Sequence, residues 1–154
     1  EPFSGGGPRF LEELKEAIPV IGEKHPLLLG RENRAVLGYS LGGLFALWAF
    51  CAGDLFGTAA SLSGSLWYEG WMEYLPGHVP EKAGKVYLSL GKKEETSGPA
   101  RMRRVGENTR QTAEILRLAG RFGEVPLRME NGGHFTDIPG RWQTAFCWLD
   151  EIQK

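Results

Sequence analysis

The stretch from Val36 to Phe50, VLGYSLGGLFALWAF, constrains this chain most, because a serine stands between glycines where two apolar segments meet. The short segment 35–37 is typical of a buried strand. Residues 41–51 predict a helix that is apolar on nearly every face, and such a helix has to be packed deeply. The serine turn between them is therefore expected at the edge of a hydrophobic core.

The turn Gly38-Tyr39-Ser40-Leu41-Gly42 has the pattern G-x-S-x-G in a strand–turn–helix context. In that context Ser40 is a candidate nucleophile on a strained turn, and the two flanking glycines are expected to make room for crowded backbone. The N–H of Leu41, at the helix N-terminus, is a candidate donor to a developing oxyanion. The alternative is a tight turn in which Ser40 only caps the helix.

The rest of the chain alternates between helical and extended patterns. Apolar residues at three- to four-residue spacing predict helices over 10–21, 101–120 and from about 139. Short strands are predicted at 58–62, 85–90 and 125–129. This order predicts an α/β fold, a parallel sheet with helices on both faces, in one domain over 1–154. The last helix is striped by Trp142, Ala145, Phe146, Leu149 and Ile152.

A serine becomes a nucleophile only when a base takes its proton, and the loop after the last predicted strand contains a histidine. His134 follows two glycines there, whereas His25 precedes the serine and His78 lies in an aromatic insertion. His134 is therefore the candidate base. The alternative is a surface histidine in a glycine-rich turn.

The third member of such a set is a carboxylate that lies between the serine and the histidine in chain order. Glu94 follows the strand 85–90 and is the candidate, with Glu95 close behind it. The alternative for both is a solvated run of charges. Asp137 is nearer to His134 in sequence, but we predict that it caps the helix that begins near Pro139.

Candidate substrate contacts come from the aromatic insertion after the strand 58–62 and from Tyr39 in the serine turn. In the insertion we expect Trp67 and Tyr68 to contact an aromatic or acyl group. Trp71 and Tyr74 fit that role and ordinary packing equally well. Arg101 is a candidate for meeting an anionic substrate or, alternatively, a plain surface arginine.

Composition excludes several other classes of function. A formal net charge of -1 gives no basic surface for nucleic acid. No apolar run approaches the ~18 residues of a membrane span, so no membrane partner is expected. Two distant cysteines indicate neither a disulfide framework nor a zinc site, which fits a reducing cytoplasmic setting. No spacing predicts a metal or an organic cofactor, and the expected partner is a small-molecule ester.

With these residues assembled, the chain resembles the esterase family of the α/β-hydrolases that includes enterobactin esterases, S-formylglutathione hydrolase and the mycolyltransferases. The similar features are the segments 38–44, 63–67 and 132–135, the glycines 5–7 before the first helix, and Ile18-Pro19 near its end. The resemblance covers essentially all 154 residues. It implies a Ser-His-acid hydrolase of esters, with siderophore trilactones as one known substrate class.

The chain departs from the family at its beginning, where the resemblance implies further strands before the first helix and a second oxyanion donor. Without a neighbour on that side, the strand 35–38 becomes an open apolar edge, through which we expect self-association. The loss of one oxyanion donor costs about 3 kcal/mol of transition-state stabilisation. We therefore expect a polypeptide that lacks its N-terminal strands, and that is a poor catalyst alone or an obligate oligomer.

Three functions fit the sequence. The first is a serine esterase in which Ser40 attacks, His134 acts as base and then acid, and Glu94 orients the imidazole. The second is an acyltransferase that uses the same three residues. The third is a non-catalytic binding module on a truncated hydrolase fold.

Overall fold

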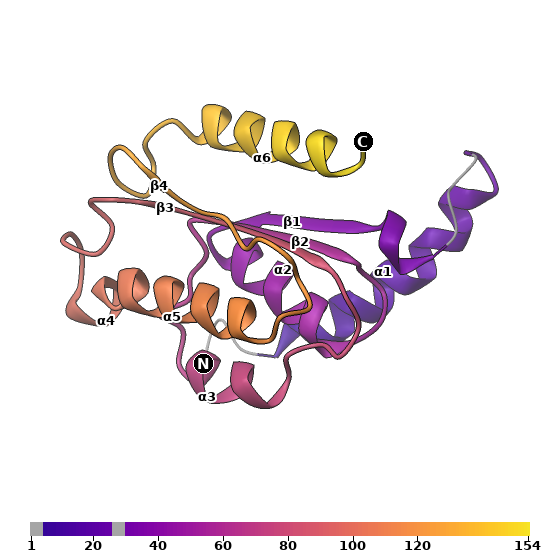
Figure 1. The fold of residues 1–154 in the computed structure, drawn as a ribbon, viewed down its shortest axis with the longest axis horizontal. Helices are drawn as coiled ribbons and strands as arrows, with labels where there is room; N and C mark the ends of the chain where they lie inside the picture. Colours follow the sequence, from indigo (N-terminus) through magenta and orange to yellow (C-terminus); the bar gives the residue numbers. More distant parts are fainter. Residues whose placement is uncertain (1–4, 26–29) are drawn as a thin grey trace.

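The computed structural model describes residues 5–25 and 30–154, and the centre of the fold is a four-stranded parallel sheet in the order β1-β2-β3-β4 (Figure 1). Its strands are β1 (Ala35–Tyr39), β2 (Thr58–Leu62), β3 (Lys85–Gly91) and β4 (Leu127–Glu130). The helices are α1 (Gly6–Gly22), α2 (Leu41–Ala52), α3 (Trp71–Tyr74), α4 (Ala100–Arg103), α5 (Val105–Leu118) and α6 (Ile138–Ile152). Short 3-10 turns occur at Arg31–Asn33 and Leu75–Gly77.

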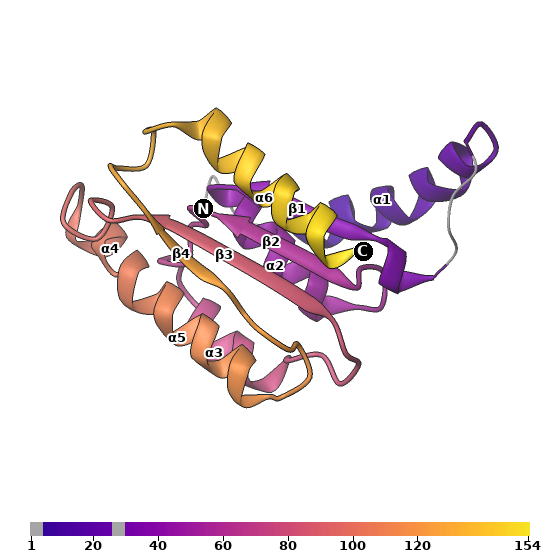
Figure 2. The same ribbon diagram turned by 45° about the horizontal axis from the view of Figure 1, so that its top comes forward.

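Helices cover both faces of the sheet, as the sequence predicts. In Figures 1 and 2, α6 lies alone over one face, whereas α2 and α5 lie beneath the other. Side chains alternate between the two faces along each strand. In β2, Ala59 points into the larger core with Leu47 and Phe50 of α2, and its neighbour Ala60 points into a smaller core with Ala145 of α6.

The α2 helix is packed deeply in the fold, which agrees with its apolar composition. Ala46, Leu47, Ala49 and Phe50 are almost inaccessible to solvent. α1 packs on the outer side of α2, where the rings of Phe10 and Phe45 lie 5.0 Å apart. The C-terminal half of α1 extends away from the body of the molecule (Figure 1), which leaves Ile21 about half exposed.

β1 forms one edge of the sheet among the described residues, and it pairs only with β2. Leu37 lies opposite Ala60 in this parallel register, and Tyr39 lies opposite Leu62. Most of β1 is half-buried, whereas every residue of β2 is buried. The strand before the serine turn is therefore an edge strand in this structure.

Several boundaries differ from the sequence prediction. α1 begins at Gly6 and not at Phe10, so two of the three glycines expected before the first helix lie in its first turn. β4 begins at Leu127 and not at Val125, because Pro126 has no N–H to donate to the ladder. The carbonyl of Pro126 still accepts the N–H of Leu88 at 2.9 Å. The helix predicted over 101–120 divides at Arg104 into α4 and α5, and it ends at Leu118 just before the left-handed Gly120.

The buried stripe of α6 differs from the predicted one. Arg141 and Ala145 are its fully buried residues, and Phe146 is 54% exposed. The stripe is rotated because the side chain of Arg141, four residues before Ala145, points inward to polar partners. Asp137 caps α6 as predicted: its Oδ1 accepts the N–H of Gly140 at 3.1 Å.

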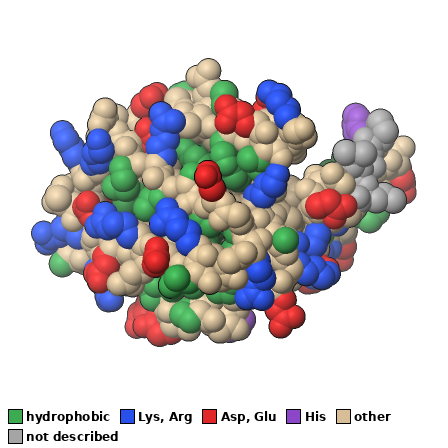
Figure 3. Space-filling view, viewed as in Figure 1, with side chains coloured by type: hydrophobic (Ala, Val, Ile, Leu, Met, Phe, Trp, Pro, Cys, Tyr) green, Lys and Arg blue, Asp and Glu red, His purple; other side chains and the backbone are tan. Residues whose placement is uncertain are grey.

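Charges of both signs are interspersed over the face drawn in Figure 3, without a continuous basic area. In the part of the chain that the structure describes, no helix combines the length and the apolar character that a membrane span requires.

Candidate active site

Ser40 lies on a sharp turn between β1 and α2, with a positive φ of 59°. A serine rarely adopts this region, so the turn is strained and has to be held by its surroundings. The N–H of Ser40 donates to the carbonyl of Leu62 at 3.0 Å, and its carbonyl accepts the N–H groups of Gly43 and Ser65 at 3.0 and 2.9 Å. These bonds fix the direction in which the hydroxyl projects.

The glycines of the turn are crowded in a different pattern from the one predicted. A Cβ on Gly38 would lie 1.9 Å from the carbonyl oxygen of Gly42, so no side chain fits there. The prediction that Gly42 is also crowded is wrong, because a Cβ there would meet no described atom within 4 Å. The crowded position is Gly43, where a Cβ would lie 2.9 Å from the Cα of Gly64. α2 therefore approaches the loop after β2 through Gly43.

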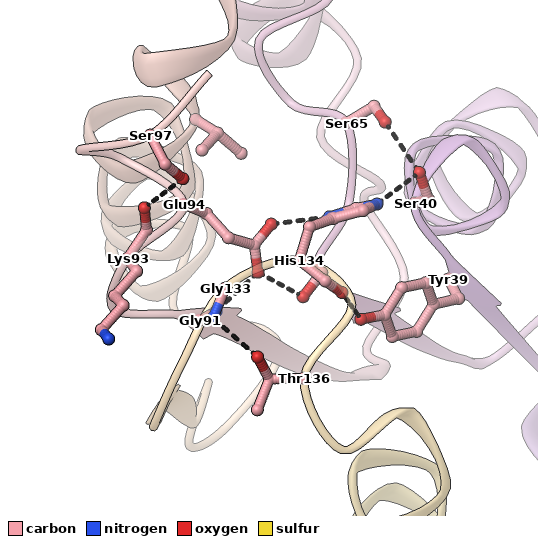
Figure 4. A network of polar contacts seen from close by, with 12 residues as sticks. Tyr39, Ser40, Ser65, Gly91, Lys93, Glu94, Ser97, Gly133, His134 and Thr136 are labelled. Atoms are coloured by element: carbon pink, nitrogen blue, oxygen red, sulfur yellow. Dashed lines mark hydrogen bonds and ion pairs between the residues drawn. The ribbon is translucent and has the colours of Figure 1, made fainter.

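The three candidate catalytic side chains follow three different strands and meet at one edge of the sheet (Figure 4). Ser40 follows β1, Glu94 follows β3 and His134 follows β4. Carboxyl ends of parallel strands share one edge, where ligands bind in open α/β sheets. The Nε2 of His134 lies 3.0 Å from the Oγ of Ser40, and its Nδ1 lies 2.7 Å from the Oε2 of Glu94.

The proton positions in this chain of contacts follow from the charge of Glu94. Burial by itself raises the pKa of the Glu94 carboxyl, but hydrogen bonds from His134, Ser63 and the Gly91 N–H outweigh it and hold that pKa below its usual range. An ionised carboxylate only accepts, so Nδ1 of His134 carries the proton. In the neutral imidazole Nε2 is then the acceptor for the Ser40 hydroxyl. This is the protonation state that a general base requires.

Glu95 points away from this site and forms an exposed ion pair with Arg110 on α5. Of the two adjacent carboxylates, only Glu94 contacts His134, and its side chain is 6% exposed. The two alternatives that the sequence left open are thus separated by the direction of their side chains.

Several contacts hold the loop that carries His134 in place. The phenol of Tyr39 donates to the carbonyl of His134, and the N–H of Gly133 donates to the Oγ1 of Thr136 at 3.0 Å. A Cβ on Gly91 would lie 2.7 Å from the carbonyl oxygen of Gly132. The acid loop and the histidine loop therefore pass each other at a distance that only glycine permits.

Arg141, Ser63 and Ser65 belong to this site and were not predicted from the sequence as functional residues. Arg141 is 2% exposed and donates to Glu94, and Ser63 Oγ donates to Oε1 of Glu94 at 2.7 Å. The Oγ of Ser65 lies 3.4 Å from that of Ser40. One signal was available for Arg141: it stands four residues before Ala145, so a charge occupies the buried face of a helix.

A pocket of about 410 Å³ opens beside these side chains. Its volume lies within the range that small-molecule sites occupy. Besides the three candidate catalytic residues, the lining residues include Ser65, Trp67, Ser97, Met102, Val105 and Phe135. The pocket thus joins a polar end at Ser40 to apolar walls.

The predicted substrate contacts lie in different places. Trp67 lines the pocket, and the guanidinium of the exposed Arg101 lies 5.2 Å from the centre of its ring. Tyr68 lines a second pocket of about 400 Å³, which Leu41 also lines. Tyr39 directs its hydroxyl to the His134 loop. Trp71 is buried and donates to Thr112 at 2.9 Å, which is a packing contact.

Leu41 is the first residue of α2, so its N–H is among those that have no acceptor within the helix. It follows Ser40 directly, at the positive end of the helix dipole. Cys51 is no rival nucleophile, because burial raises the pKa of its thiol to about 12. Within residues 5–25 and 30–154, no three His, Cys, Asp or Glu side chains are grouped so as to hold a metal ion.

The parallel sheet with helices on both faces is an α/β-hydrolase-like fold, and comparison with known proteins gives the family. The family described as "Putative esterase" matches residues 8–147, and the chain belongs to it. The chain is 31% identical to the uncharacterized protein YbbA of Bacillus subtilis over 96% of its own length.

Solved structures share the fold. The siderophore hydrolase EstA of Aspergillus nidulans superposes with a TM-score of 0.77 at 22% identity over 97% of this chain. The enterobactin esterase FES of Shigella flexneri gives 0.68 at 24% identity over 94%. The chain spans 61% of the Bacillus protein, 58% of the Aspergillus structure and 37% of the Shigella structure.

Proposed function

We propose that this chain provides the catalytic residues of a serine esterase that cleaves carboxylic esters through an acyl-enzyme. The observation that carries the proposal is the unbroken series of contacts from Ser40 through His134 to Glu94, at 3.0 and 2.7 Å, beside a pocket. Membership of an esterase family agrees with it.

In the proposed first step, Ser40 Oγ attacks the ester carbonyl while Nε2 of His134 takes its proton. The carbonyl oxygen becomes an oxyanion that the Leu41 N–H stabilises, and Glu94 stabilises the imidazolium. The imidazolium then gives its proton to the leaving alkoxide, which departs as an alcohol. Water, deprotonated by His134, hydrolyses the acyl-enzyme and restores Ser40.

We propose siderophore esters as the first substrates to test. Two structures that share the fold are called a siderophore hydrolase and an enterobactin esterase. The apolar walls of the pocket, which include Trp67 and Phe135, suit an acyl or aromatic group next to the scissile bond. The same three residues would also serve an acyltransferase in which an alcohol replaces water.

Labelling with a fluorophosphonate tests the nucleophile directly. We expect one adduct on Ser40, its loss in Ser40→Ala, and a fall in labelling rate of at least about 10⁴-fold in His134→Ala. The matched control is His78→Ala, because His78 stacks on Tyr74 outside the site. The adduct is located by peptide mass spectrometry, since Ser65 is close by.

The outcome that contradicts the proposal is folded protein that remains unlabelled, or a label that His134→Ala does not slow. Such a result would favour the binding module. If labelling succeeds, product analysis with an added alcohol separates the esterase from the acyltransferase.

A further inference from the structure

Arg141 is the largest fully buried side chain in the described part of the protein. It lies at the candidate active site, where it forms an ion pair with Glu94. It projects from the first turn of α6 toward the end of β1 and the loops after β2, β3 and β4. A buried arginine without partners would destabilise the fold strongly, so its contacts identify what it holds.

The two terminal nitrogens of Arg141 reach four groups. Nη1 donates to Oε1 of Glu94 at 3.1 Å, to Ser63 Oγ, and to the phenol oxygen of Tyr39 at 3.3 Å. Nη2 donates to the carbonyl of Gly133, next to His134, at 2.8 Å. One guanidinium therefore connects the carboxylate to the backbone of the loop that carries the imidazole.

The two oxygens of Glu94 have different partners. Oε1 accepts from Arg141, from Ser63 at 2.7 Å and from the N–H of Gly91 at 2.8 Å. Oε2 faces Nδ1 of His134. The contacts on Oε1 fix the plane of the carboxylate and direct Oε2 to the histidine.

We propose that Arg141 is a positioning residue for catalysis: it sets the Glu94 carboxylate and the His134 loop in one geometry and balances the buried negative charge. This inference rests on the proposed function. Because the planar fork of arginine donates in two directions, a lysine can keep the charge but cannot hold both groups.

The effect on pH dependence has a definite sign. The titratable groups around Arg141 are Glu94, to which it is ion-paired, the Tyr39 phenol, and His134 beyond Glu94. When the cation is removed, the negative charge of Glu94 is no longer balanced, and the site holds a proton more firmly. The acid limb of the kcat/KM profile then moves to higher pH.

The experiment compares Arg141→Met, Arg141→Gln and Arg141→Lys with the wild-type chain. The matched control is Arg110→Met. This variant removes the exposed ion-pair partner of Glu95, the residue that follows Glu94 in the sequence. The first readout is kcat/KM for a p-nitrophenyl ester, expressed per active site as counted by fluorophosphonate titration. The second is the pH profile of this kcat/KM. The third is the downfield signal of the Nδ1 proton of His134 in NMR spectra. Arg141→Gln keeps polar contacts if Arg141→Met fails to fold.

In Arg141→Met and Arg141→Gln we expect kcat/KM per active site to fall about a hundredfold, the cost of a small misplacement of reacting groups. The acid limb of the kcat/KM profile should move to higher pH by about one unit, and the Nδ1 proton signal of His134 should broaden or vanish. Arg141→Lys should keep the limb in place and recover part of the rate. Arg110→Met should match the wild type.

A purely structural role for Arg141 would lower the fraction of folded protein without changing kcat/KM per active site, the limb or the NMR signal, and this result would overturn the proposal. The NMR signal is independent of ester cleavage. If the wild-type chain takes no fluorophosphonate label, the proposed esterase function fails. Even then, an unchanged Nδ1 proton signal in Arg141→Gln contradicts the positioning role of Arg141.

Discussion

At the scale of single residues, the site depends on one buried carboxylate that stays ionised. Glu94 is surrounded by donors from four places in the chain: the Gly91 N–H, Ser63, His134 and Arg141. The hydrogen bonds from His134, Ser63 and the Gly91 N–H outweigh the desolvation that burial imposes, and Arg141 forms an ion pair with the carboxylate that they keep charged. The same contacts connect the proposed chemistry to the stability of the fold.

The lowered pKa of Glu94 predicts how stability depends on pH. In the unfolded chain a glutamate has a pKa of about 4.3. Because the folded pKa is lower, ionised Glu94 stabilises the fold above that value, and this contribution is lost as the pH falls through the folded pKa. Glu94→Gln should therefore be less stable than the wild type at pH 7, and the difference should shrink in acid.

Urea unfolding of both proteins across acid and neutral pH measures this difference. The matched control is Glu95→Gln, since Glu95 is partly exposed and its partner Arg110 lies at the surface. A stability difference for Glu94→Gln that stays constant across that range would contradict the assignment.

At the scale of elements, the junction of β1 and α2 is the most demanding piece of local structure. The two glycines of the pattern have opposite surroundings: a Cβ on Gly38 would lie 1.9 Å from the carbonyl oxygen of Gly42, whereas a Cβ on Gly42 would meet open space. The pattern is symmetric in sequence and asymmetric in space.

The two glycines therefore predict opposite results for the same substitution. Gly38→Ala should lower the free energy of unfolding by about 3 kcal/mol or more, because the methyl group has to displace backbone. Gly42→Ala should be neutral or stabilising by up to about 1 kcal/mol, because alanine is the better helix former and meets no neighbour. Thermal and urea unfolding of the two variants checks this. Equal destabilisation would contradict the geometry.

The elements also show where sequence patterns succeed. The strand 58–62 was predictable because every position in it is buried, and the apolar run 41–51 because most of its positions are buried or half-buried. Phe146 was not, since α6 turns Arg141 inward, and that rotation depends on a carboxylate in a loop distant in sequence. A pattern of apolar residues does not show that a charged side chain such as Arg141 is buried through a polar contact.

At the scale of the whole molecule, the β1 edge is the surface on which the expectation of self-association rests. Arg34 O accepts the N–H of Thr58, and the N–H of Ser40 donates to Leu62 O, so even-numbered residues of β1 face β2. The backbone of Ala35, Leu37 and Tyr39 then faces outward. Exposed edges of this kind are templates for pairing with another chain.

Self-association through this edge stays a prediction, and a proline tests it. We expect a sedimentation coefficient that rises with concentration for the wild-type chain and a smaller rise for Ala35→Pro. Proline removes an outward N–H at the first residue of the strand, where Arg34 already has an extended backbone that tolerates a following proline. Leu37→Ala is the control, because it keeps the outward N–H. A monomer at all concentrations would contradict the prediction.

By itself the sequence determined the α/β class, the serine turn and the order of the three candidate residues, because each depends on local patterns: apolar runs, glycines at a turn, and polar residues directly after strands. The tertiary structure alone decided that Glu94 and not Glu95 meets the histidine, that Gly43 and not Gly42 is crowded, and that Arg141 lies inside. These depend on the direction of a side chain relative to segments distant in sequence. Only the packing of the four strand ends at one edge sets those directions.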